Sequence, residues 1–171
     1  MKTSRVTVKP YDEKWSADFE AIKLELQGAL GELALAIEHV GSTAVVGLSA
    51  KPCIDIDVVI EDYSVLDEVV RALSNIGYVH EGDLGISGRE AFDYSDKPHL
   101  AKHHLYVCPK DSAELKRHLA FRDFLRSDPD VMQKYGRVKE EAARRFPNDI
   151  DGYMAYKSSC IEEIYKICGL K

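Results

Sequence analysis

Several features that define other protein classes are missing from this chain of 171 residues. No apolar run reaches the ~20 residues that a membrane-spanning helix needs, so we expect no membrane partner. The four cysteines form no Cys-x-x-Cys pair and no dense cluster, so we expect reduced thiols. The net charge is −6, and this lack of excess positive charge argues against nucleic acid or acidic membranes as general partners.

Targeting and linker segments are also absent from the printed sequence. Met1 is followed by polar residues, not by the apolar core of a signal peptide, so we expect a cytoplasmic protein. No repeat, low-complexity tract or Gly/Ser linker interrupts the chain, and 45% of its residues are apolar, enough for a sizeable core. We therefore expect one compact unit with or without a helical extension.

The spacing of apolar residues predicts an α/β (α+β) protein whose C-terminal part is helical. The expected helices cover 12–30, 64–76, 112–126, 128–146 and 148–168, and the expected strands cover 34–40, 53–60, 78–80, 86–94 and 103–108. Ser64 is a candidate N-cap, Pro129 suits a first helical turn, and Gly169 follows the last helix. We divide the unit into an α/β core, 1–110, and a helical part, 111–171, packed on it.

The most informative segment is a Gly41-Ser42 turn followed by Asp55 and Asp57 in an apolar strand. Side chains alternate along a strand, so both acids share one face, with their Cα atoms roughly 7 Å apart. Two carboxylates on one face can hold a divalent cation. If a short helix opens after Ser42, its first N–H groups face an anion such as a phosphate. Together these features predict a metal and phosphate site.

The residue pattern around these acids is similar to a known signature. An apolar-Gly-Ser turn, a short helix and Asp-x-Asp on a strand resemble the nucleotidyltransferase superfamily. The run from His39 to Asp57 resembles the GrpB family of nucleotidyltransferase-like proteins, and later matches span nearly the whole chain. These later matches are Arg89, 103–107, 121–126, 135–139 and 153–157. The resemblance implies a nucleotidyltransferase-like mixed sheet with flanking helices and a C-terminal helical extension, but it names no substrate.

The resemblance also implies roles for individual residues. Asp55 and Asp57 are expected to bind Mg²⁺ (or Mn²⁺) and to serve catalysis together with His104. The phosphates of a nucleoside triphosphate are assigned to Gly41, Ser42, Thr43, Lys51, Arg89, Lys139 and Lys157. Glycine permits a close backbone approach, and Ser42 can donate a hydroxyl. The simpler alternatives are an exposed acidic strand face, an ordinary turn and solvated basic helix faces. Cys53 shares the acidic face by parity, but we interpret it as a small core residue.

Histidines close to one another raise a second question. His99, His103 and His104 do not predict a zinc site, because the Glu of a zincin is missing and the last two point to opposite strand faces. His104 is expected on the face of the acids. Nucleotidyltransferases usually carry a third carboxylate on a later strand, and this sequence offers His104 there, with Asp93 and Glu90 as weaker substitutes. An ordinary imidazole titrates near ~6.5, so we expect nucleotide affinity to change between pH 6 and 8.

The leading functional hypothesis is a Mg²⁺-dependent, nucleotidyltransferase-like protein that binds a nucleoside triphosphate and transfers a nucleotidyl group to an unknown small-molecule or macromolecular acceptor. Two alternatives stay open. The same site would serve a catalytically inactive nucleotide- or metabolite-binding module, which the missing third acid favours. An interaction domain associated with coenzyme A metabolism would need neither metal nor nucleotide, and GrpB domains do occur fused to dephospho-coenzyme A kinase.

Overall fold

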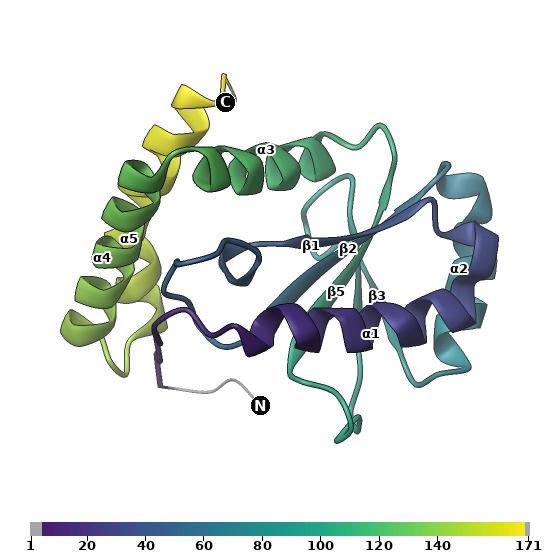
Figure 1. Cartoon of the computed structure of the whole chain (residues 1–171). Helices are drawn as coiled ribbons and strands as arrows, with labels where there is room; N and C mark the ends of the chain where they lie inside the picture. The colour runs from purple at the N-terminus through teal and green to yellow at the C-terminus, as the bar shows by residue number, and fades with distance from the viewer. Residues whose placement is uncertain (1–4, 170–171) are drawn as a thin grey trace.

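A single mixed sheet forms the centre of the protein, as shown by a computed structural model that describes residues 5–169. Its five strands lie in the order β1-β2-β5-β4-β3 (Figure 1). Their bounds are β1 Ala36–Val40, β2 Ile54–Ile60, β3 Val79–Gly82, β4 Glu90–Asp93 and β5 His103–Pro109. Strand β2 pairs antiparallel with β1 and parallel with β5, and the remaining pairs are antiparallel. The predicted α/β class with a mixed sheet is confirmed.

Five α-helices pack around the sheet within residues 5–169. Their bounds are α1 Lys14–Leu30, α2 Leu66–Ser74, α3 Ala113–Ser127, α4 Pro129–Arg145 and α5 Ile150–Ile167. The helix starts follow from capping: Ser112 accepts a hydrogen bond from the Leu115 N–H at 3.2 Å, and Asp128 accepts one from the Val131 N–H at 3.1 Å. None of the helices in residues 5–169 combines the length and apolar character that a membrane crossing requires.

Two local predictions were wrong. Ser64 is not the N-cap of α2, because the Asp62 side chain accepts the Ser64 N–H at 2.9 Å and starts a 3₁₀ turn, Tyr63–Val65, ahead of the helix. The strand expected at 86–94 is reduced to β4. Gly85 and Gly88 both have positive φ, so the segment before β4 forms turns. A strand cannot run through these two positions.

Helices α1 and α2 cover one face of the sheet (Figure 1). The side chains of β2 that point to this face are aliphatic and almost fully buried: Ile54, Ile56, Val58 and Ile60. They pack with Leu105 and Val107 of β5, in the alternation expected for one strand face. This layer is the main hydrophobic core, and it leaves the opposite face of β2 and β5 for polar residues.

Helices α3, α4 and α5 lie toward that opposite face and one end of the sheet (Figure 1). Leu115 of α3 packs on Val59 and Cys108, which are buried on this side of β2 and β5. Helices α4 and α5 pack against each other and, with α3, bury Val45 and Leu48 from the segment between β1 and β2. The helical part therefore encloses the turn and the acidic strand face predicted to form the site.

Candidate functional site

The turn after β1 is held against the acidic strand by a glycine. Gly41 has φ +74°, a conformation that other residues rarely adopt, and a Cβ atom there would clash with the Asp55 carboxylate. The expected short helix is only a 3₁₀ turn, Ser42–Ala44. Glycine is thus required here because the Asp55 carboxylate lies against the backbone.

The acids and His104 share one face of the sheet, as predicted. Parallel pairing of β2 with β5 places Asp55 beside His104 and Asp57 beside Tyr106. His104 Nδ1 lies 3.0 Å from Asp55 Oδ1. Hydrogen bonds to Asp55 and Cys53 raise the pKa of His104 to about 10. This raised pKa favours the protonated imidazole beside Asp55, and the pH dependence of nucleotide affinity stays a prediction.

Asp57 is the more enclosed of the two acids. Its side chain is fully buried, and Oδ2 accepts a hydrogen bond from His118 Nδ1 of α3 at 2.5 Å. Burial raises the pKa of Asp57, although the hydrogen bond and charge of His118 oppose the rise. Asp57 Oδ1 is also buried and has no hydrogen-bond partner within residues 5–169. An unpaired buried carboxylate oxygen is costly, so this atom is suited to a cation.

Two lysines from the C-terminal helices reach the same region. Lys139 is 2% exposed, and its Nζ has no hydrogen-bond partner in the described part of the chain. Burial, helped by the charge of Lys157, lowers the pKa of Lys139 to about 7. Burial also lowers the pKa of Lys157. Each ammonium lies 4.7 Å from the ring centroid of a tyrosine on its own helix, Tyr135 and Tyr153 respectively.

These groups line two small pockets that meet at Asp55. One pocket, of about 150 Å³, is lined by Ser42, Thr43, Ala50, Lys51, Cys53, Asp55, His104, Lys139, Tyr153 and Lys157. The other, of about 210 Å³, is lined by Val40, Gly41, Asp55, Arg89, Tyr106 and His118. The fold thus brings nine of the ten predicted site residues to the pocket walls, and Asp57 lies next to them beneath His118.

Arg89 enters the second pocket from the segment that precedes β4. Its guanidinium carbon lies 4.2 Å from the ring centroid of Tyr106, and its buried Nε lacks a hydrogen-bond partner among the described residues. The two weaker substitutes for a third carboxylate line neither pocket. Both belong to β4, which β5 separates from the acids of β2. Glu90 pairs with His80 at 3.2 Å, and Asp93 is exposed.

Sequence reasoning missed several groups around the turn. His118, Arg122 and Arg126 follow one another at four-residue intervals on α3, which places them on one helix face. Arg122 donates to the His39 carbonyl at 3.1 Å, and Arg126 donates twice to the Ala44 carbonyl, at 3.0 and 2.8 Å. The two arginines therefore hold the backbone on both sides of the Ser42–Ala44 turn. Their four-residue spacing was the signal in the sequence.

His99 and His103 each have a partner away from the acids. His99 Nε2 lies 2.8 Å from Glu25 Oε1, and His103 Nε2 lies 2.7 Å from the Tyr78 hydroxyl on the core side. Cys53 is buried, as expected, but its Sγ also lies within 4.8 Å of ligand atoms of Asp55 and His104. It is therefore part of the pocket wall as well as a small buried residue.

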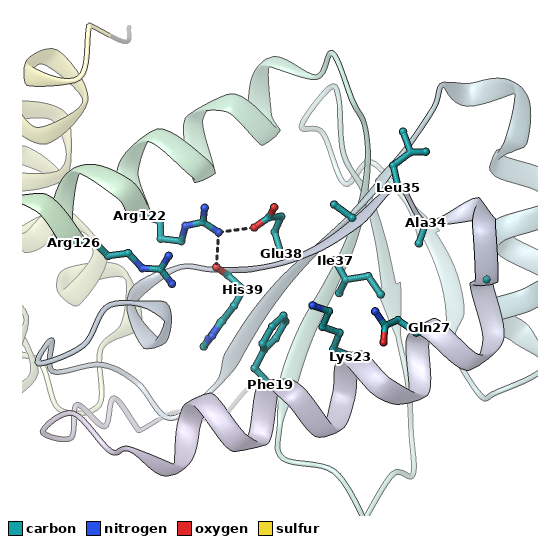
Figure 2. A pocket seen from close by; sticks show the side chains of 12 residues that line it. Phe19, Lys23, Gln27, Ala34, Leu35, Ile37, Glu38, His39, Arg122 and Arg126 are labelled. Carbon is teal, nitrogen blue, oxygen red and sulfur yellow. Dashed lines mark hydrogen bonds and ion pairs between the residues drawn. The ribbon is translucent and has the colours of Figure 1, made fainter.

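A larger groove, of about 500 Å³, lies on the outer edge of β1 between α1 and α3 (Figure 2). Figure 2 shows Arg122 on its wall, already bonded to Glu38 and to the His39 carbonyl. The Arg126 guanidinium is bonded to the Ala44 carbonyl. Because its arginines are already paired, the groove offers weaker grounds for a charged ligand than the two small pockets at Asp55.

Known proteins resemble this chain over most of its length. The family described as "GrpB protein" matches residues 5–167. YqkA of Bacillus subtilis is 30% identical over 158 residues, which cover 92% of this chain but only 46% of YqkA. "Glutamate-rich protein GrpB" of Alkalihalophilus pseudofirmus is 33% identical over 93% of both chains. A protein of Mycolicibacterium paratuberculosis named dephospho-CoA kinase is 31% identical over 94% of this chain and 45% of its own length.

Solved structures extend the comparison to the fold. The crystal structure of conserved protein GrpB from Enterococcus faecalis has a TM-score of 0.79 and 35% identity, and the match covers 94% of this chain and 98% of that chain. Cid1 in complex with its short product ApU has a TM-score of 0.56 at 14% identity, over 80% of this chain and 43% of that chain. The fold is therefore shared with the GrpB structure and, more distantly, with Cid1, and the chain belongs to the GrpB protein family.

Proposed function

We propose that the protein binds a nucleoside triphosphate together with Mg²⁺ (or Mn²⁺) at the two pockets around Asp55. One observation carries this proposal: a buried carboxylate oxygen of Asp57 and a buried ammonium of Lys139 both lack partners within residues 5–169. A buried charge without a partner lowers the stability of the fold, whatever its sign. A ligand that brings a cation and an anion together, as a metal-bound triphosphate does, satisfies both.

The donor set fits a hard divalent cation. Asp55 is partly exposed and Asp57 Oδ1 has no protein partner, so the pair supplies the oxygen ligands that Mg²⁺ prefers. When bound, the ion supplies positive charge that neutralises phosphate oxygens. Gly41 allows the turn to lie against Asp55, and His118 orients the Asp57 carboxylate through Oδ2.

The polar groups of the first pocket are assigned to the phosphates. Ser42 and Lys51 line it, while Lys139 and Lys157 reach it from α4 and α5. Thr43 supports the turn through the hydrogen bond of its hydroxyl with His39 Nε2 at 2.8 Å. Arg89 lines the second pocket, where it can neutralise charge on the far side of Asp55.

The role of His104 separates two versions of the function. In a transferase, the nucleotidyl group passes to an acceptor and pyrophosphate leaves, and the metal ions that assist this transfer need the negative charge of acidic ligands to bind. The ion pair of His104 with Asp55 reduces that charge. This observation favours a catalytically inactive nucleotide- or metabolite-binding module as the second candidate. An interaction role beside coenzyme A metabolism rests on the relatives named dephospho-CoA kinase.

Thermal unfolding with nucleoside triphosphates, with and without Mg²⁺, tests the proposal. At a ligand concentration ~100 times Kd, binding adds about 2.7 kcal/mol, which should raise Tm by roughly 5–10 °C in a chain of this size. Asp55→Asn with Asp57→Asn should remove the shift and leave the protein folded, whereas Asp93→Asn, an exposed acid of β4, should keep it. A flat profile across all common nucleotides with metal excludes nucleotide binding. Pyrophosphate release from α-labelled nucleotides then separates the transferase from the binding module.

A further inference from the structure

Three side chains that line the first pocket bring together a sulfur, an oxygen and a nitrogen. Ligand atoms of Cys53, Asp55 and His104 all lie within 4.8 Å of one another. Cys53 precedes Asp55 by two positions and shares its strand face, and the parallel pairing of β2 with β5 places His104 beside Asp55. The sheet backbone therefore sets the spacing of this trio.

The chemistry of these three atoms differs from that of a magnesium site. Thiolate and imidazole select Zn²⁺ and similar ions, whereas Mg²⁺ prefers oxygen ligands in an octahedral arrangement. Bond lengths of about 2.0–2.3 Å put neighbouring ligand atoms of tetrahedral zinc roughly 3.3–3.8 Å apart. Separations under 4.8 Å come within that range after small side-chain rotations. Three protein ligands with an open fourth position are typical of zinc sites that bind water or substrate.

Asp55 is the acid able to change its partners. Asp57 is fully buried and held by His118, whereas Asp55 is partly exposed and bonded to the half-exposed His104. Cys53 is buried at the pocket wall, which shields its sulfur from bulk solvent. When a metal binds, the thiol and the imidazolium release their protons to solvent, and bonds to the metal replace the hydrogen bond between His104 and Asp55.

We propose that Cys53, Asp55 and His104 bind a thiophilic divalent cation of the Zn²⁺ class, which competes with Mg²⁺ for Asp55. Lys51 and Lys157 line the same pocket, so an anion such as phosphate can take the open fourth position. Binding of the Zn²⁺-class ion is independent of the proposed function. Only its competition with Mg²⁺ for Asp55 rests on that function.

Titration of the full chain with Co²⁺, without nucleotide, tests the site. We expect the intense near-ultraviolet band of a thiolate–cobalt bond and the visible bands of tetrahedral cobalt, both removed by Zn²⁺. Cys53→Ala should weaken Co²⁺ binding at least about 100-fold, since even supporting residues of metal sites are worth 10–100-fold. Cys168→Ala is the matched control, because Cys168 lies at the end of α5 and its Sγ donates to the Ala120 carbonyl at 3.8 Å.

The outcomes separate this inference from the proposed function. Persistence of the thiolate band in Cys53→Ala, its loss in Cys168→Ala, or its absence from the unaltered protein overturns the metal trio. If Cys53→Ala does not fold, His104→Ala at the half-exposed position carries the same test. Absence of the cobalt bands from an unaltered protein that still binds nucleotide rejects only the trio, and a protein that binds Co²⁺ but no nucleotide rejects only the proposed function.

Discussion

The two faces of the central sheet handle buried charge in opposite ways. Under α1 and α2 the β2 side chains are aliphatic, and the buried Lys97 is paired with Glu25 at 2.8 Å. On the other face, Asp57 and Lys139 each leave a buried charged atom without a partner in residues 5–169. The first face stabilises the fold by itself. The unpaired charges of the second face lower the stability of the fold unless a ligand is bound. Such a local loss of stability is expected at a functional site.

The largest difference in stability should be between substitutions at two adjacent residues of β2 that point to opposite faces, Ile56 and Asp55. Ile56→Ala leaves a cavity in the aliphatic core and should lower the free energy of unfolding by about 2–5 kcal/mol. Asp55→Asn removes a half-exposed ion pair and should cost no more than about 1 kcal/mol, yet it should abolish Mg²⁺-dependent nucleotide binding. Urea unfolding and thermal shift with nucleotide measure the two effects. Equal losses of stability would contradict the comparison between the faces.

Removing the two buried lysines should change stability in opposite directions. Lys139→Met removes an unpaired buried ammonium and should raise the free energy of unfolding of the ligand-free protein by about 1–3 kcal/mol while weakening triphosphate binding. Lys97→Met, the matched control, removes the partner of Glu25 and the contact with Tyr78. It should lower the free energy of unfolding by about 1 kcal/mol. Urea unfolding of both variants provides the measurement. A destabilised Lys139→Met protein would show that this lysine is already satisfied without a ligand.

Because Lys139 titrates, the difference in the free energy of unfolding between the unaltered protein and Lys139→Met should depend on pH. Its pKa is lowered from the ordinary 10.5 to about 7 by burial, so between these values the unfolded chain holds a proton that the folded protein lacks. Stability relative to Lys139→Met should therefore rise with pH through this window, by up to about 1.4 kcal/mol per pH unit. Urea unfolding of both proteins at several pH values measures this slope, and a constant difference from pH 7 to 10 would contradict it.

Nucleotide binding should draw a proton onto the same lysine. A bound phosphate stabilises the charged ammonium, so near pH 8 triphosphate binding should be accompanied by uptake of up to about one proton. Calorimetry in buffers with different ionisation enthalpies measures this number. Lys139→Met should reduce it, whereas the exposed Lys110→Met should not, because Lys110 lies outside both pockets and pairs with Glu61.

The smallest effect should come from the helix face that holds the turn. Arg126→Lys cannot reproduce the two hydrogen bonds to the Ala44 carbonyl and should lower stability by about 0.5–1.5 kcal/mol. Amide hydrogen exchange should become faster in the Ser42–Ala44 turn and stay unchanged in α2, on the far side of the sheet. Unchanged exchange in the turn would show that Gly41 and Thr43 hold it without the arginine.

The elements and the acidic face could be predicted because both depend on short-range patterns. Apolar spacing placed all five helices, and alternation along β2 placed Asp55 and Asp57 away from the aliphatic core. The same parity argument placed His104 with the acids. The boundaries near Ser64 and at 86–94 were wrong where competing caps and glycine turns decided the backbone.

The amino-acid sequence alone determined which residues share a strand or helix face, because side-chain direction repeats with a fixed local period. It did not determine which faces meet. Only the tertiary structure placed His118 on Asp57, 61 positions apart, and His104 within reach of Cys53. The burial of Lys139 arises in the same way, from the packing of α4 and α5 around the turn. Strand register and helix docking are set by long-range packing, and that packing converts a pattern of charges into unpaired groups able to bind a ligand.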